Sequence, residues 1–310
     1  MDLALQVVVT GLAAGGVYGI VAIGHSLVFQ LTGTVYLALG DLIGLGVFTT
    51  LLVAAGTGPI TQTNVSSSRY LLALCVGVLV CVVVGAGGYA LVVQPFLERG
   101  STVGWIGATL ALAFAIHAVI ESVFPRSAYV FPDPIPFRRV GEAGFLTLAG
   151  ASFSVRALYV AAVAFALAGL VAWAVNRTRT GRGLQAITAD REGALVVGVP
   201  VAWLVPLAFG LAGAVAAVAA VVGAPSAPVS GQTGTLLGVK GLAAALAVRF
   251  GPPHYAFAAG ALLGLLEAAV ATVHLSGFEL GPAYSQVLPL AAVLVLLAWR
   301  PPAEALEDVE

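Results

Sequence analysis

Charge is the scarcest property of this sequence. Only 9% of its 310 residues are Asp, Glu, Lys or Arg, and Lys240 is its single lysine. Hydrophobic residues make up 60% of the chain, and the mean hydropathy is +1.05. A typical soluble domain is about 45–50% apolar and about 25% charged. Because so few charges cannot cover a surface that faces water, the sequence predicts an integral membrane protein.

Other absences narrow the function. The 13 basic and 14 acidic residues nearly cancel, so no positive patch for nucleic acid is predicted. The two cysteines, Cys75 and Cys81, share one apolar run but not one helical face, which favours neither a disulfide nor a metal site. No GxxxxGK[ST] phosphate loop, HExxH pair or hydrolase constellation occurs. We therefore expect no catalysis and no cofactor on this chain, and any ATP must bind to another polypeptide.

Long apolar runs occupy most of the chain. A helix that crosses ~30 Å of hydrocarbon needs about 20 apolar residues, and the first run lacks the flanks of a signal peptide, so we expect it to be retained. The predicted spans are 5–29, 34–55, 70–93, 102–124, 155–175, 201–222, 254–275 and 284–300. A ninth run, 235–249, is short and contains Lys240, so it either crosses or re-enters the bundle. These runs predict an all-α, polytopic bundle of 8–9 transmembrane segments that forms one domain over 1–310.

Glycine is abundant, with 38 residues, and is spaced for helix packing. Gly11, Gly15 and Gly19 recur every four positions, and so do Gly40 and Gly44. Small residues at this spacing let the backbones of membrane helices approach closely. The pattern predicts a tightly packed bundle.

Two loops are long. The first, 125–154, has four prolines between 125 and 136, which exclude a helix there, and then FLTLAGASFSV (145–155), which is typical of a small hairpin. We expect 125–154 to form an extracytoplasmic cap. The second loop, 176–200, contains six charged residues. When it is placed inside with nine crossings, seven arginines lie inside and five outside, so the positive-inside rule favours a cytoplasmic loop.

The 176–200 loop is predicted to contain an amphipathic helix over 184–197. We expect the chain to break at Thr180-Gly181, the helix to be interrupted at Gly193, and its end to come before Pro200. One face holds small or aliphatic side chains, namely Leu184, Ile187, Ala194, Leu195 and Gly198. The helix either lies on the lipid surface or docks into a groove of a partner protein. The face has no Trp or Phe to anchor it in headgroups, which favours the groove.

Three charged residues fall inside apolar runs: Asp41, Lys240 and Glu267. A charge at the centre of a bilayer costs at least ~2.5–3.5 kcal/mol. Either these residues line or gate a path, or they pair structurally. Four further residues lie nearer the ends of the runs, where side chains can reach water: His25, His117, Glu121 and His274.

Several stretches resemble one family. These are GLAAGGVYGIVAIGHSLVFQLTG (11–33), VYLALGDLIGLGVF (35–48), GRGLQAITADREGALVVGVPVAWLVPLAFGLAGA (181–214), GVKGLAAALAVRFG (238–251) and GALLGLLEAAV (260–270). They are similar to the membrane permease subunits of bacterial ABC importers for branched-chain amino acids, and the first helix resembles the H-type permease. The family's NFAHGE box reads differently here, with Tyr36, Ala38, Leu39, Gly40 and Asp41.

The resemblance implies an ATP-driven importer in the bacterial inner membrane. It implies cytosolic ATPase subunits that bind ATP and Mg, a second permease subunit (identical or related) and an extracytoplasmic substrate-binding protein. The 176–200 loop would be the coupling helix, with contacts from Gly181, Arg182, Leu184, Ala186, Asp190, Arg191, Gly193, Ala194 and Gly198. For Asp41, Lys240 and Glu267, a role in lining or gating the translocation path and a structural pairing both stay open. A permease of this family for urea or short amides, and a stand-alone secondary transporter, are the alternatives.

Overall fold

The computed structural model describes residues 2–57, 65–99, 102–132, 145–148 and 151–272, together with 274–275, 278–279, 287 and 291. Its helices are α1 (Asp2–Thr32), α2 (Leu39–Ala55), α3 (Ser67–Gly88), α4 (Gln94–Glu98), α5 (Thr102–Val123), α6 (Val155–Arg177), α7 (Arg179–Ala189), α8 (Arg191–Val196), α9 (Val201–Gly223), α10 (Thr233–Ala247) and α11 (Pro253–Thr272). A π-helical turn, Tyr89–Val93, joins α3 to α4, and a 3-10 turn, Ala224–Ser226, follows α9. The strands are β1 (Phe145–Leu148), β2 (Ala151–Ser154), β3 (His274–Leu275) and β4 (Phe278–Glu279).

Six helical segments in the described part of the chain are long and apolar enough to cross a membrane. They are Leu5–Thr32, Ser67–Leu97, Gly104–Val123, Val155–Arg177, Val201–Ser226 and Pro253–Thr272. They indicate a multi-pass membrane protein. The predicted span 34–55 is shorter than expected, because α2 begins only at Leu39 and has 17 residues. The short run 235–249 forms the 15-residue α10, and the predicted span 284–300 lies outside the described residues apart from 287 and 291.

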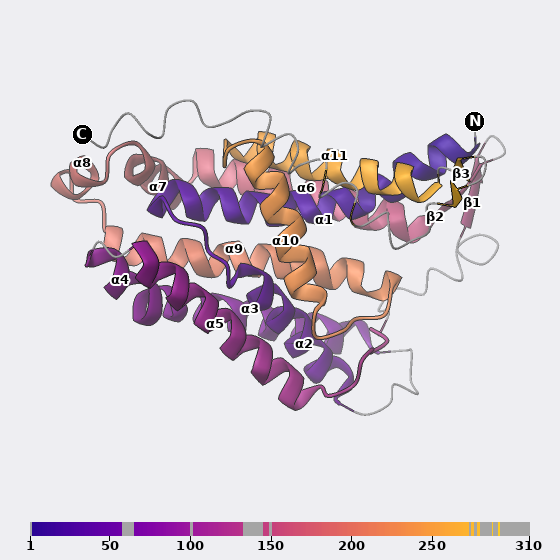
Figure 1. Ribbon diagram of the computed structural model, residues 1–310, viewed down its shortest axis with the longest axis horizontal. Coiled ribbons are helices and arrows are strands. Elements are labelled where there is room, and N and C mark those ends of the chain that lie inside the picture. Colours follow the sequence, from indigo (N-terminus) through magenta and orange to yellow (C-terminus); the bar gives the residue numbers. More distant parts are fainter. Residues whose placement is uncertain are drawn as a thin grey trace.

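The strands β1 and β2 and the helices α7 and α8 lie at opposite ends of the bundle (Figure 1). At one end, which we call the hairpin end, β1 and β2 lie beside the beginning of α1; α7 and α8 mark the other, which we call the loop end. The predicted hairpin is confirmed, since β1 pairs antiparallel with β2, from Phe145 opposite Ser154 to Leu148 opposite Ala151. Residues 124–132, which hold the first prolines, are not helical.

Glycines set the closest helix contacts, as their spacing predicts. A Cβ on Gly15 would lie 2.6 Å from the Ala261 carbonyl oxygen, and one on Gly11 would lie 2.9 Å from the Leu265 Cα. The α1 and α11 backbones therefore touch along most of their shared length. In the same way, a Cβ on Gly40 of α2 would lie 3.0 Å from the Gly234 carbonyl oxygen of α10.

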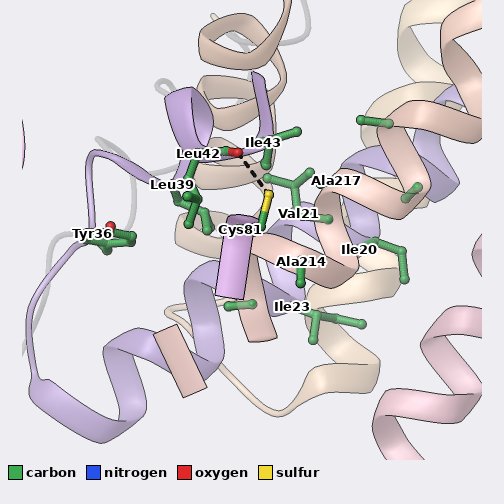
Figure 2. Close-up of a cluster of buried hydrophobic side chains, with 14 of the residues drawn as sticks. Ile20, Val21, Ile23, Tyr36, Leu39, Leu42, Ile43, Cys81, Ala214 and Ala217 are labelled. Atoms are coloured by element: carbon green, nitrogen blue, oxygen red, sulfur yellow. Dashed lines mark hydrogen bonds between the residues drawn. The ribbon is translucent and has the colours of Figure 1, made fainter. Parts of the chain in front are cut away.

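The apolar core lies where α1, α2, α3 and α9 meet (Figure 2). Leu39 and Leu42 of α2, Val21 of α1 and Cys81 of α3 are fully buried there. The Cys81 thiol donates a hydrogen bond to the Leu42 carbonyl oxygen at 3.3 Å. Cys75, by contrast, is exposed, and both cysteines are free thiols.

Candidate functional site

The loop between α6 and α9 begins with a capped break at Thr178. The backbone of this residue is extended, and its side-chain oxygen accepts a hydrogen bond from the Gly181 N–H at 3.0 Å. A threonine in this position satisfies one of the free N–H groups of a new helix. The prediction that the chain breaks at Thr180-Gly181 is therefore wrong: both residues lie in the first turn of α7. A Cβ on Gly181 would collide with the carbonyl oxygens of Ala174 and Val175.

A second capped break separates α7 from α8. Asp190 has an extended backbone, and its Oδ1 accepts hydrogen bonds from the N–H groups of Glu192 and Gly193, each at 3.0 Å. The helix is thus interrupted at Asp190 and not at Gly193 as predicted. The physical reason is that an aspartate side chain competes for backbone N–H groups and favours a helix N-terminus over a helix interior.

The face that was predicted to dock on a partner is only partly available. Ile187 and Ala194 are 3% exposed, because they pack against the protein's own helices. Leu195, which the helical wheel placed on the same face, is 56% exposed, and Val196 and Val197 next to it are 87% and 77% exposed. Among the other predicted coupling residues, Gly181 is buried, Leu184, Ala186 and Gly193 are half-buried, and Arg182, Asp190, Arg191 and Gly198 are exposed.

Two cavities lie along the same three helices, α1, α6 and α9. The hairpin-end cavity, of about 560 Å³, reaches from Thr10 and Ser154 to Tyr18 and is also lined by α10. The loop-end cavity, of about 490 Å³, is almost entirely apolar, and Gly181 and Leu184 of α7 form part of its wall. One helix surface of α6 therefore faces both cavities.

The two cavities are separated by a contact between small residues. Ala164 of α6 is 1% exposed, and a Cβ on Gly16 of α1 would lie 2.7 Å from the Ala164 Cβ. The buried residues of α6 are Val160 and Ala164 alone. The helix α6 is thus held against α1 mainly near its middle, and only Thr178 separates it from α7.

Lys240, which is buried, and Glu267, which is half-buried, form an ion pair inside the bundle. The Lys240 ammonium donates to both carboxylate oxygens of Glu267, at 2.8 and 2.9 Å, and to the Tyr18 hydroxyl at 2.9 Å. These side chains come from α10, α11 and α1. Because each charge has a partner, the energetic cost of holding them inside the membrane is reduced.

Asp41 belongs to a different cluster. Its Oδ1 accepts a hydrogen bond from the Thr235 hydroxyl at 2.7 Å and lies 3.1 Å from the His117 Nδ1. The other ring nitrogen of His117 lies 3.3 Å from the Glu121 Oε1. The structure therefore brings two of the three predicted path residues together and separates the third. Asp41 and Thr235 lie in the first turns of the short helices α2 and α10, so this cluster ties both helices to α5.

His117, whose side chain is 23% exposed, bridges two carboxylates, as described above. His25 differs from the prediction that it reaches water. His25 is 3% exposed, and its Nε2 lies 3.2 Å from the Gly238 carbonyl oxygen. The burial of His25 was not predicted, because the sequence placed this residue near a helix end. The helix α1 extends to Thr32, beyond the predicted end at residue 29. His274 lies in β3, and nothing is described of its side chain.

The long apolar helices, the capped polar loop at one end and the paired charges inside the bundle are those of a multi-pass membrane protein. Residues 7–297 match the family described as branched-chain amino acid transport system / permease component. The chain belongs to this family of transporter permease subunits, and it is therefore not an enzyme.

Curated relatives agree with this assignment. The chain is 26% identical over 302 residues to the high-affinity branched-chain amino acid transport system permease protein BraD of Pseudomonas aeruginosa, covering 96% of this chain and 94% of that protein. It is 22% identical over 305 residues to the permease protein LivH of Salmonella typhimurium, with coverage of 96% and 94%. The resemblance noted in the sequence to branched-chain amino acid permeases is confirmed.

Proposed function

We propose that this protein is the membrane subunit of an ATP-driven importer of branched-chain amino acids in a bacterial inner membrane. The observation that carries the proposal is the α7–α8 loop: the single residue Thr178 joins it to α6, in a chain of the permease family. The importer would also contain cytosolic ATPases that bind ATP and Mg, a second permease subunit, and an extracytoplasmic binding protein that selects the cargo.

The proposed topology has 8–9 crossings within one permease domain, 1–310. Residues 176–200 face the cytoplasm, which is supported by the exposed side chains of Arg177, Arg179, Arg182 and Arg191. Residues 125–154 form the extracytoplasmic cap, which is supported by the position of β1 and β2 at the opposite end of the bundle. The short helices α2 and α10 are buried against other helices, as re-entrant or broken segments of membrane proteins must be.

In this proposal the ATPase binds the exposed surface of the α7–α8 loop, which we call the coupling loop. Arg182 and Arg191 supply charge, and Leu195, Val196 and Val197 form an apolar projection of three consecutive side chains. An exposed aliphatic run of this kind in a cytoplasmic loop is best covered by a protein groove. Leu184, on the half-buried side of the loop, lines the loop-end cavity. A displacement of the loop by the ATPase is therefore transmitted to that cavity.

Alternating access then depends on the contact that holds α6 against α1. When the ATPases close and displace α7, α6 tilts about the contact between Gly16 and Ala164. Such a tilt widens the cavity on one side of the contact and narrows the cavity on the other. Each nucleotide state must stabilise one of the two tilts, since coupling requires differential contacts in the two states.

Charge reversal at Arg182 tests the coupling role. In reconstituted complexes, Arg182→Glu should lower ATP-dependent uptake of leucine by roughly tenfold or more, as expected for loss of ~1.4 kcal/mol or more of coupling. Gly193→Trp should act in the same direction, although it also displaces the capping side chain of Asp190. ATP hydrolysis and thermal stability should change much less than uptake. The measurement is the ratio of leucine transported to ATP hydrolysed.

Arg126→Glu is the matched control, because Arg126 is exposed and lies near the Tyr129–Val229 bridge, away from α7 and α8. Uptake by this control should be close to wild type. Normal coupling in Arg182→Glu would contradict the proposed role of the loop. Uptake driven by a proton gradient without ATP would instead support the secondary-transporter alternative, and transport of urea or acetamide in place of leucine would reassign the cargo.

A further inference from the structure

The hairpin-end cavity has the size and chemistry of a ligand site. Its volume of about 560 Å³ falls within the ~300–1,000 Å³ that is typical of small-molecule sites. Aliphatic side chains from four helices form its walls, including Val17, Val47, Val160 and Leu237. An unbranched polar molecule would gain little from such walls, whereas a branched aliphatic side chain would be removed from water on several sides.

Several polar side chains line this cavity. Among the described residues that line it, Arg156 carries the only charge, and it lies in the first turn of α6 directly after β2. Hydroxyl groups of Thr10, Ser154 and Ser226 also belong to the lining. A guanidinium group binds a carboxylate with two parallel hydrogen bonds, and hydroxyl oxygens accept hydrogen bonds from an ammonium group.

The inner limit of the cavity is the Tyr18 side chain. Tyr18 is 7% exposed, and its hydroxyl accepts a hydrogen bond from Lys240, which is held in turn by Glu267. We call Tyr18, with its partners Lys240 and Glu267, the floor of the cavity. These three residues join α1, α10 and α11. Toward the loop end, Tyr18 and the contact between Gly16 and Ala164 therefore bound the cavity.

We propose that the hairpin-end cavity is a resting site for the permeating amino acid inside this subunit. Arg156, directly after β2, binds the carboxylate, the hydroxyls accept from the ammonium group, and the branched side chain fills the aliphatic part of the cavity beside Tyr18. This inference rests on the proposed import function and assigns a place within it. One charged contact holds the cargo weakly, which suits a site that must release it on every cycle.

Thiol labelling tests occupancy directly. The chain has two cysteines, Cys75 and Cys81, so Cys75→Ser/Cys81→Ser gives a background in which a thiol can be introduced alone. In this background we would make Ala157→Cys, which faces the cavity, and Leu158→Cys, whose parent residue is 43% exposed on α6. A charged, water-soluble methanethiosulfonate added to the assembled importer should modify the thiol at position 157. Millimolar leucine should slow that reaction about fivefold or more and leave position 158 unaffected.

Uptake supplies the second readout. Val160→Trp fills the cavity and should reduce leucine uptake at least tenfold, while Leu158→Trp on the opposite surface of α6 should not. Arg156→Gln should raise the KM for leucine about tenfold with little change in the maximal rate, and Arg156→Lys should restore part of the loss. Basal ATP hydrolysis by the assembled complex reports folding and assembly in every variant.

The outcomes separate the two proposals. If the wild-type complex shows no ATP-dependent leucine uptake, the import function fails. If uptake is normal but leucine gives no protection at position 157 and Val160→Trp transports like wild type, the cavity assignment alone is overturned. Modification of position 157 only by a lipid-soluble maleimide would also overturn it, because the cavity would then contain a lipid chain.

Discussion

Replacing Gly264 by valine should prevent the protein from accumulating in a folded form. A Cβ at this position would collide with the backbone of Gly15 and would lie 2.6 Å from the Gly11 carbonyl oxygen. Overpacking a well-filled interior usually costs ~1–3 kcal/mol when flexible side chains can adjust. Here the obstruction is the backbone of α1, so α1 and α11 must separate. Close backbone contact is a main source of helix association in lipid, and we expect the cost to exceed that range.

The measurement is the yield of monodisperse protein in mild detergent and its melting temperature. Two other glycines supply matched controls, because a Cβ on Gly87 of α3 or Gly169 of α6 would meet nothing within 4 Å. Gly87→Val and Gly169→Val should express and melt close to wild type. If Gly264→Val behaved like these controls, the close approach of α1 to α11 would be contradicted.

One side of this interface, the glycine face of α1, was predictable from the sequence. The spacing of Gly11, Gly15 and Gly19 was sufficient to predict that α1 packs closely against another helix, since small residues on one helical face have few other uses in a membrane. It did not identify α11 as the partner. That choice depends on the order of helices around the bundle, and six helices of similar composition do not encode this order in their local pattern.

The α7–α8 loop was predictable only in part. Hydrophobic periodicity predicted an amphipathic helix, and α7 and α8 are helical. The interruption at Asp190 was missed although its signal, an aspartate with its side chain free to cap the next turn, was present. Burial was harder to predict: the wheel placed Leu195 with Ile187 on one face, but the break at Asp190 rotates α8 relative to α7. As a result Leu195 is exposed while Ile187 is buried.

The intramembrane charges were recognisable individually but not as pairs. The cost of a charge in hydrocarbon marks Asp41, Lys240 and Glu267 from composition alone. Which partner each one meets depends on the rotation and depth of its helix. For Lys240 the acidic partner was among the marked residues, whereas Asp41 meets His117, which had been grouped with the residues near the ends of the runs.

Removing the lysine should have the second large effect. In Lys240→Met, the Glu267 carboxylate, 18% exposed as a side chain, loses its ammonium partner inside the bundle. Breaking a buried ion pair from one side typically costs ~3–5 kcal/mol, because the remaining charge stays desolvated and unpaired. We expect a large fall in melting temperature and in yield, and no measurable uptake from what remains.

The double variant Lys240→Met/Glu267→Leu decides what the pair is for. Replacing both partners by apolar residues of similar size is often neutral for stability, so the melting temperature should return close to wild type. We expect uptake to remain at least tenfold reduced, because the Tyr18 hydroxyl has then lost its donor and the floor of the hairpin-end cavity is no longer fixed to α10. Recovery of both stability and uptake would show that Lys240 and Glu267 only hold the bundle together. Recovery of stability without uptake places the pair in the transport cycle, and Tyr18→Phe, which removes the hydroxyl and leaves the ion pair intact, should then reproduce part of the same defect.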